Sequence, residues 1–123
     1  MEDNNDNFGK TDMIAENELR VGNYVKCVEG NIIRINKDDM MCILTQTYEV
    51  KPIRITEEIL LKCGFDWKEY NDYRHPVLIG TLTLYEGVAE LNISDMYSVW
   101  VNSLHQLQNI HFALMGEELE VKI

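Results

Sequence analysis

The strongest constraint on the fold is the apolar periodicity of residues 103–116, near the C-terminus. Apolar side chains recur there at spacings of three and four, which places them on one face of a helix. Asn102 or Ser103 can cap the first turn, and Gly116 stands where a left-handed residue ends a helix. Because such a helix needs a layer to cover, the segment predicts one long helix packed on a sheet. The predicted buried face consists of Leu104, Leu107, Ile110, His111, Leu114 and Met115.

Two polar residues, Gln108 and His111, interrupt this apolar face. A buried polar group without a hydrogen-bond partner costs about 1–3 kcal/mol, so each is expected to find one. The preferred interpretation of His111 is a hydrogen-bonded core histidine, and the alternative is a ligand or a general base. His105, Gln106 and Asn109 point away from the apolar face and are expected to meet solvent or a partner.

The net charge of −10 is spread unevenly along the 123 residues, a length that suits one domain or two packed subdomains. Residues 56–123 carry eleven acidic and four basic side chains, a net charge of −7, which disfavours nucleic-acid binding there. Residues 18–55 carry +1 and could form a small basic face, although scattered solvated charges are the preferred interpretation. The nucleic-acid candidates of this alternative are Arg20, Lys26, Arg34, Lys37, Lys51 and Arg54.

Residues 1–17 are rich in Asn, Asp and Glu and are predicted to form a disordered acidic tail. The three cysteines, Cys27, Cys42 and Cys63, include no C-x-x-C pair. No apolar run approaches the roughly 18 residues that a membrane span requires. We therefore expect a cytoplasmic protein with free thiols and no membrane partner.

Residues 18–55 show four strand-like runs separated by turn signals. The first run begins at Tyr24, and the other three cover residues 32–35, 40–45 and 48–55. A turn is expected at residues 37–39. Pro52 lacks an N–H group, which favours an edge or a strand end. The segment is predicted to be a β-rich subdomain, either an SH3-like small barrel or a twisted antiparallel sheet.

Residues 56–123 are predicted to form an α+β subdomain packed against the first, which makes the whole chain α+β. A short helix begins after Thr56 and ends at Gly64. An antiparallel meander follows, with a turn at residues 71–72 and strands at 75–85, 88–93 and 97–101. The long helix and a last strand at residues 118–123 complete the predicted subdomain.

No arrangement typical of a metal, phosphate or cofactor site is present in the sequence. The cysteines and histidines do not cluster at zinc-ligand spacings, and there is no glycine-rich phosphate loop or nucleophile elbow. We therefore predict no cofactor, no metal and no catalytic residue. An enzyme that pairs Cys63 or Cys27 with a histidine is kept as the least favoured alternative.

Three stretches together resemble a known family. They are LRVGNYV at residues 19–25, TEE through CGF at 56–65, and HQLQN through GEEL at 105–119. The chain resembles a family of small uncharacterised proteins of gut anaerobes that are carried on prophages and other mobile elements. The resemblance implies a mobile-element setting and carries over no activity and no site residue.

The favoured hypothesis is a non-enzymatic protein-interaction or structural accessory protein. Its partner would be another protein or a second copy of itself. Neutral polar and aromatic side chains tolerate desolvation at an interface better than the charges of the acidic half do. The predicted partner-binding residues are His105, Gln106, Asn109, Trp67, Tyr70 and Tyr73.

Overall fold

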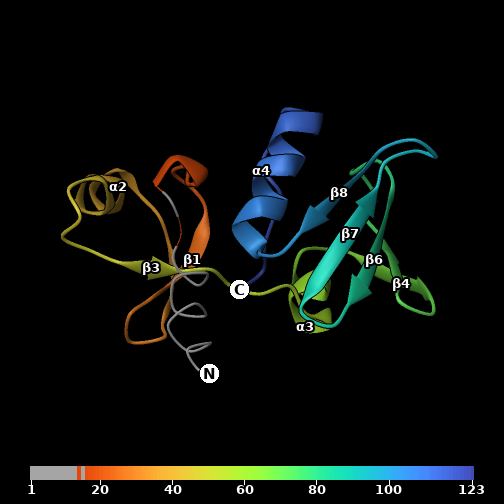
Figure 1. Ribbon diagram of the computed structural model, residues 1–123, viewed down its shortest axis with the longest axis horizontal. Coiled ribbons are helices and arrows are strands. Elements are labelled where there is room, and N and C mark those ends of the chain that lie inside the picture. The colour runs from red at the N-terminus through yellow and green to blue at the C-terminus, as the bar shows by residue number, and fades with distance from the viewer. Residues whose placement is uncertain (1–13, 15) are drawn as a thin grey trace, which may run out of the picture. The chain divides into compact units, whose positions relative to one another are not determined.

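The computed structural model describes residue 14 and residues 16–123, which form an α+β fold with two antiparallel sheets (Figure 1). The chain divides into two compact units, Met1–Ile53 and Arg54–Ile123, and each is described separately. The predicted α+β class is confirmed. The predicted tail lies mostly outside the described residues, and its last two residues belong to the short 3-10 helix η1 (Glu16–Glu18).

The N-terminal unit is built on β1 (Tyr24–Cys27), which pairs with β2 (Ile32–Arg34) on one side and β3 (Val50–Lys51) on the other. In the described residues the sheet is open and no barrel closes, so the SH3-like barrel is not confirmed. The strand predicted at residues 48–55 is reduced to β3, which ends before Pro52. The core of this unit consists of Leu19, Val25, Ile35, Ile43 and Val50.

The strand predicted at residues 40–45 is wrong, because this segment belongs to helix α2 (Lys37–Leu44). The helix begins with a capping box. Asn36 Oδ1 accepts a hydrogen bond from the Asp39 N–H at 2.8 Å, and Asp39 Oδ2 accepts one from the Asn36 N–H at 3.0 Å. Two acidic residues in the first turn also suit the helix dipole. Asp38 and Asp39, which were predicted to lie in a turn of the chain, therefore lie in the first turn of α2.

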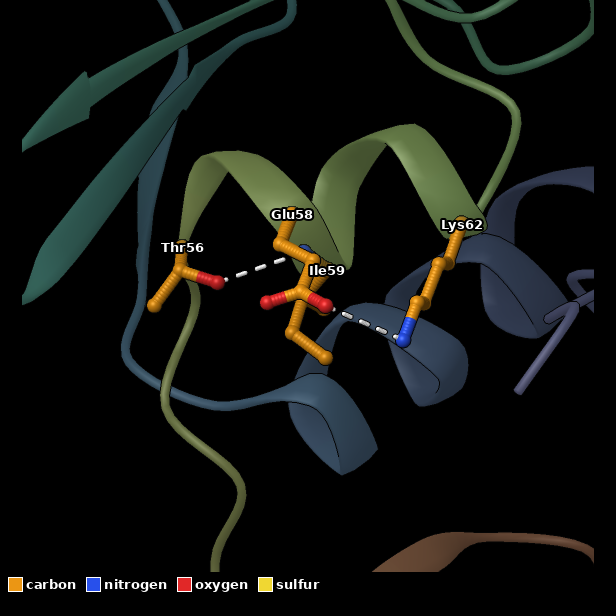
Figure 2. A network of polar contacts seen from close by, with 4 residues as sticks. All are labelled: Thr56, Glu58, Ile59 and Lys62. Carbon is orange, nitrogen blue, oxygen red and sulfur yellow. Dashed lines mark hydrogen bonds and ion pairs between the residues drawn. The ribbon is translucent and has the colours of Figure 1, made fainter.

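Helix α3 (Glu57–Lys62) confirms the short helix predicted after Thr56. Figure 2 shows its first turn, where Thr56 Oγ1 accepts a hydrogen bond from the Ile59 N–H at 3.2 Å. The Lys62 ammonium lies 3.2 Å from Glu58 Oε2, one helical turn away. Gly64 (φ 89°) lies just past the end of the helix, and the Phe65 N–H donates a hydrogen bond to the Leu60 carbonyl at 3.0 Å. This is the αL stop expected from the sequence.

The second sheet is an antiparallel meander in the order β4-β5-β6-β7-β8 (Figure 1). Tyr73, Leu82 and Leu91 lie side by side in the register and are buried, so this face packs on the core of the unit. Helix α4 (Leu104–Met115) follows directly after the last strand. The strands are β4 (Asp66–Glu69), β5 (Asp72–Arg74), β6 (Thr81–Tyr85), β7 (Val88–Asn92) and β8 (Ser98–Val101).

Three predicted boundaries in this unit are wrong. The strand predicted from residue 75 begins only at Thr81, because Pro76 and Gly80 (φ 97°) interrupt the extended backbone. The turn expected at residues 71–72 lies one residue earlier, with Tyr70 in a left-handed conformation. Residues 118–123 form no strand, although the Lys122 N–H donates to the Lys62 carbonyl at 2.8 Å.

Helix α4 confirms the predicted long helix, but its buried face is turned from the predicted one. Leu104, Leu107 and His111 are buried as expected, whereas Leu114 is exposed. Gln108, which interrupts the predicted apolar face, is buried as well, and His105 is buried although it was expected to be exposed. Within the described chain, none of the helices has both the length and the apolar character to cross a membrane.

Candidate functional site

The face of the β4–β8 sheet opposite the buried one carries a row of polar and aromatic side chains. The register places Asp72 beside Thr83, Thr83 beside Glu90, and Glu90 beside Trp100. Because side chains alternate between the two faces of a strand, this row points away from the buried Tyr73–Leu82–Leu91 row. We call this side the open face and define it by Asp72, Thr83, Tyr85, Glu90, Asn92 and Trp100.

The open face carries an aromatic pair. The rings of Tyr85 and Trp100 lie with centroids 5.7 Å apart and planes inclined by 48°. Both side chains are exposed, Tyr85 to 46% and Trp100 to 57%. The Tyr85 hydroxyl lies 3.4 Å from Glu90 Oε1, to which it donates. The pair is thus a preformed apolar platform with a carboxylate at its edge.

The polar part of the open face is ordered by hydrogen bonds between side chains. Thr83 Oγ1 donates to Asp72 Oδ1 at 2.8 Å, and Asn92 Nδ2 donates to Thr83 Oγ1 at 3.5 Å. These donors are neutral, so the hydrogen bonds orient the Asp72 carboxylate without cancelling its charge. The open face thus presents the oriented Asp72 carboxylate and, beside the aromatic pair, the Glu90 carboxylate. These groups suit a partner that brings both positive charge and flat or apolar groups.

Two of the residues predicted to bind a partner are buried, and that part of the prediction is wrong. Tyr73 is only 4% exposed, because strand alternation places it on the core face. His105 is 2% exposed, and its Nδ1 lies 3.0 Å from Ser103 Oγ. The buried face of α4 includes His105 because this polar ring finds a partner there. Gln106 is partly buried, and its Oε1 accepts a hydrogen bond from the Asn102 N–H at 2.8 Å.

The other predicted aromatic residues, Trp67 and Tyr70, are exposed, but they lie apart from the aromatic pair. Trp67 is opposite Tyr73 in the register, so it is on the other face of the sheet from Trp100. Its indole Nε1 donates to the Tyr70 carbonyl at 2.7 Å. Tyr85 and Trp100 were not among the residues predicted from the sequence to bind a partner. The alternation of Thr83 and Tyr85 with buried leucines was the available signal.

The basic residues of the nucleic-acid alternative are partly brought together in the N-terminal unit. Lys26 on β1 lies opposite Lys51 on β3, and both are exposed. The Arg34 guanidinium stands 5.4 Å from the centre of the Tyr24 ring, and its Nε donates to the Gly22 carbonyl at 3.3 Å. Arg54 belongs to the C-terminal unit, and Lys37 is the first residue of α2.

A separate pocket of about 370 Å³ in the C-terminal unit brings Cys63, His75 and His111 to one place. His75 Nδ1 accepts hydrogen bonds from the N–H groups of Val77 and Leu78, each at 3.1 Å. In the neutral ring the proton is therefore on Nε2. The pocket is also lined by Lys62, Gly64, Pro76, Val77, Glu117, Glu118, Glu120 and Lys122.

The pKa of His75 is lowered from its usual value, first by burial and second by the adjacent His111. A hydrogen bond with the Cys63 backbone and the charge of Asp66 act in the opposite direction. The rings of His75 and Phe65 are 5.1 Å apart, so the imidazole also belongs to the packing around the end of α3. His75 is thus held as a neutral structural group beside the pocket.

His111 confirms one part of its predicted role and departs from another. It is 2% exposed, and its Nδ1 donates to the Glu117 carbonyl at 2.8 Å, as expected for a core histidine. That hydrogen bond leaves the lone pair on Nε2. Nε2 is buried and, within the described residues, has no hydrogen-bond partner. His111 Nε2 is therefore a buried acceptor that the described residues leave without a hydrogen bond.

The environment of Cys63 does not favour the Cys–His alternative. Burial raises the pKa of the Cys63 thiol to about 12, so the thiol stays protonated near neutral pH. A nucleophilic cysteine requires the thiolate. Among the residues that the structure describes, no group of three or more Cys, His, Asp and Glu side chains could hold a metal ion.

Comparison with models of known protein families, with curated proteins and with solved structures finds no match. The function must therefore be inferred from the open face and the pocket.

Proposed function

We propose that the protein is a non-enzymatic protein-interaction module, which binds a basic segment of a partner protein on the open face of the β4–β8 sheet. The observation that carries the proposal is the exposed aromatic pair, Tyr85 and Trp100, beside the Glu90 carboxylate. Tryptophan and tyrosine are the residues that most often dominate binding energy at interfaces.

The charge of the C-terminal unit supports a basic partner. Residues 56–123 carry a net charge of −7. The open face itself presents two carboxylates, Asp72 and Glu90, in one register row. An arginine can stack on an indole face, which contributes about 0.5–2 kcal/mol, and can pair with a carboxylate through two hydrogen bonds. Complementary charge also raises the association rate.

The test follows peptide binding by the fluorescence of Trp100. The chain has two tryptophans, so Trp67→Phe leaves Trp100 as the sole indole. A synthetic peptide of alternating arginine and leucine should change the Trp100 fluorescence saturably, and added salt should weaken the binding. Trp100→Ala in the otherwise unchanged chain, followed by calorimetry, should reduce the affinity at least about tenfold.

Two controls accompany this experiment. A peptide with glutamate in place of arginine should not bind, because it meets like charge. Trp67→Phe alone should keep the affinity of the unchanged chain, because Trp67 lies on the other face. Equal binding of both peptides, or a Trp100→Ala variant that binds normally, would refute the proposal.

Nucleic-acid binding by the N-terminal unit is the second candidate, favoured by the neighbouring Lys26 and Lys51. This candidate predicts an affinity for single-stranded DNA that falls steeply as the salt concentration rises. Lys26→Glu with Lys51→Glu should then abolish the binding. No binding at low salt would eliminate this candidate.

The setting proposed for the interaction is the cytoplasm of a host that carries a prophage or another mobile element. The resemblance described above supports the mobile element. The free thiols of Cys27, Cys42 and Cys63 support a reducing compartment.

A further inference from the structure

We infer that the basic partner of the open face is a second copy of this chain, which contributes the exposed side of its β1–β2–β3 sheet. This inference rests on the proposed function and names the partner that the open face binds. We call the exposed side of the β1–β2–β3 sheet the basic face and define it by Lys26, Ile32, Arg34 and Lys51.

The register places these four side chains on one side of the sheet. Lys26 lies opposite Ile32 on β2 and opposite Lys51 on β3, and Arg34 is two residues from Ile32. Val25, the neighbour of Lys26, is buried in the core, so strand alternation directs the basic face away from the core of the unit. All three cations are exposed, and Ile32 is 39% exposed. The basic face therefore combines three positive charges with an accessible aliphatic side chain.

The position of Lys26 opposite Lys51 favours an anionic partner. Like charges directly opposite each other destabilise a pair of strands. Within the described part of the chain, neither ammonium group has a carboxylate within ion-pair distance. The nearest carboxylates along the sequence, Glu29 and Glu49, lie after the end of β1 and before the start of β3. A carboxylate from another molecule that lies between the two lysines relieves their repulsion.

The open face carries carboxylates at a matching separation. Asp72 and Glu90 are two strands apart in one register row, with Thr83 between them. Neighbouring strands are about 4.8 Å apart, so the two carboxylates are separated by about 10 Å. On the basic face, Arg34 and Lys26 are one strand and two residues apart, a separation of about 8 Å. Two opposite-charge pairs can therefore form at the same time.

The apolar groups of the two faces also correspond. Tyr85 and Trp100 present exposed rings, and Ile32 with the aliphatic stems of Lys26 and Lys51 can cover them. An ammonium group over an indole face adds a favourable electrostatic contact. Because the two faces belong to different units of the chain, the contact is head to tail. Repeated contacts of this kind produce open chains or rings of copies.

The experiment is sedimentation velocity of the full chain in low salt, at protein concentrations from about 5 μM to about 500 μM, a range that covers weak association. The mean sedimentation coefficient should rise with protein concentration, and added salt should return it to the monomer value. The arginine–leucine peptide, which occupies the open face, should also restore the monomer. All these measurements use the unchanged chain.

Two variants test the faces separately. Lys26→Glu with Lys51→Glu disables the basic face, and Glu90→Gln with Trp100→Ala disables the open face. Each variant alone should remain a monomer at every concentration. An equimolar mixture should form a one-to-one dimer and nothing larger, because the mixture retains one intact face of each kind.

Lys37→Glu with Lys122→Glu is the matched control. It makes the same change in net charge as the variant of the basic face, at two exposed lysines that belong to neither face. This control should associate like the unchanged chain. Loss of association in the control would show that net charge alone governs the effect, which would contradict the inference.

An unchanged chain that stays a monomer up to about 500 μM would overturn the inference. So would continued association of the Lys26→Glu, Lys51→Glu variant. A monomeric chain that binds single-stranded DNA through these lysines would assign the basic face to nucleic acid instead. If the chain is monomeric but the peptide still changes the Trp100 fluorescence, only the identity of the partner is wrong. If the peptide does not bind either, the proposed function fails as well.

Discussion

His75 and His111 face each other edge to face, with ring centroids 5.5 Å apart. Each uses Nδ1 to hold a different segment in place. His75 accepts from the backbone that follows β5, and His111 donates to the carbonyl of Glu117 after α4. Burial and the adjacent His111 both lower the pKa of His75. Protonation of His75 Nδ1 would end the two hydrogen bonds that it accepts, so the structural role of His75 depends on pH.

The stability of the protein should fall as the pH drops below about 6.5, the ordinary pKa of histidine. The pKa of His75 is lowered in the folded state, mainly by burial, so below this pH the unfolded chain binds a proton more readily. Above about pH 6.5, His75 is neutral in both the folded and the unfolded state, so it adds no pH dependence to the stability. Urea unfolding measured between pH 7 and pH 5.5 checks this.

His75→Asn is the matched variant for this measurement. The asparagine oxygen can accept the same backbone hydrogen bonds, but it does not titrate. Its unfolding free energy should depend less on pH in this window than that of the unchanged chain. Equal pH dependence in the two proteins would show that His75 is not responsible.

Gly80→Ala should be strongly destabilising. A Cβ at this position would clash with the Asn92 carbonyl oxygen, and the φ of 97° is unfavourable for alanine. Backbone strain and overpacking together are expected to cost about 3 kcal/mol. Gly87 is the control, because it also has positive φ but no atom within 4 Å of the added Cβ. Gly87→Ala should cost only about 1 kcal/mol in urea unfolding. Equal losses would contradict the predicted clash.

The two ends of α3 show what the sequence alone can predict. Thr56 and Gly64 start and stop the helix, respectively, and both act through hydrogen bonds between residues close in sequence, so their pattern can be recognised locally. The same kind of local signal, Asn36 with Asp39, marks the start of α2. The apolar run after it was assigned to a strand, because a short apolar run is compatible with either element.

The parts that were not predicted depend on contacts between distant residues. The sequence placed His105 on the exposed side of α4, but the long helix is buried along a different face. The pairing of Tyr85 with Trp100 requires the register of β6, β7 and β8, which no single strand specifies. The meeting of Cys63, His75 and His111 likewise results from the folding of three separate segments.

Tyr70→Asn should stabilise the protein. Tyr70 has a φ of 52°, and its side chain is 85% exposed, so its ring gains little from packing. Asparagine adopts the left-handed conformation more easily, and the Tyr70 carbonyl that accepts from Trp67 is retained. A gain of about 0.5–1 kcal/mol is expected in urea unfolding. Tyr97→Asn, at another exposed tyrosine without positive φ, should give no gain. A Tyr70→Asn variant that is less stable would contradict the argument from strain.

The most direct test of the proposed function is a map of backbone amide chemical shifts on adding the arginine–leucine peptide. The largest changes should fall on Tyr85, Glu90 and Trp100, together with their register neighbours on the open face. Changes confined to α4 or to the basic strands β1 and β3, or no saturable change, would contradict the account.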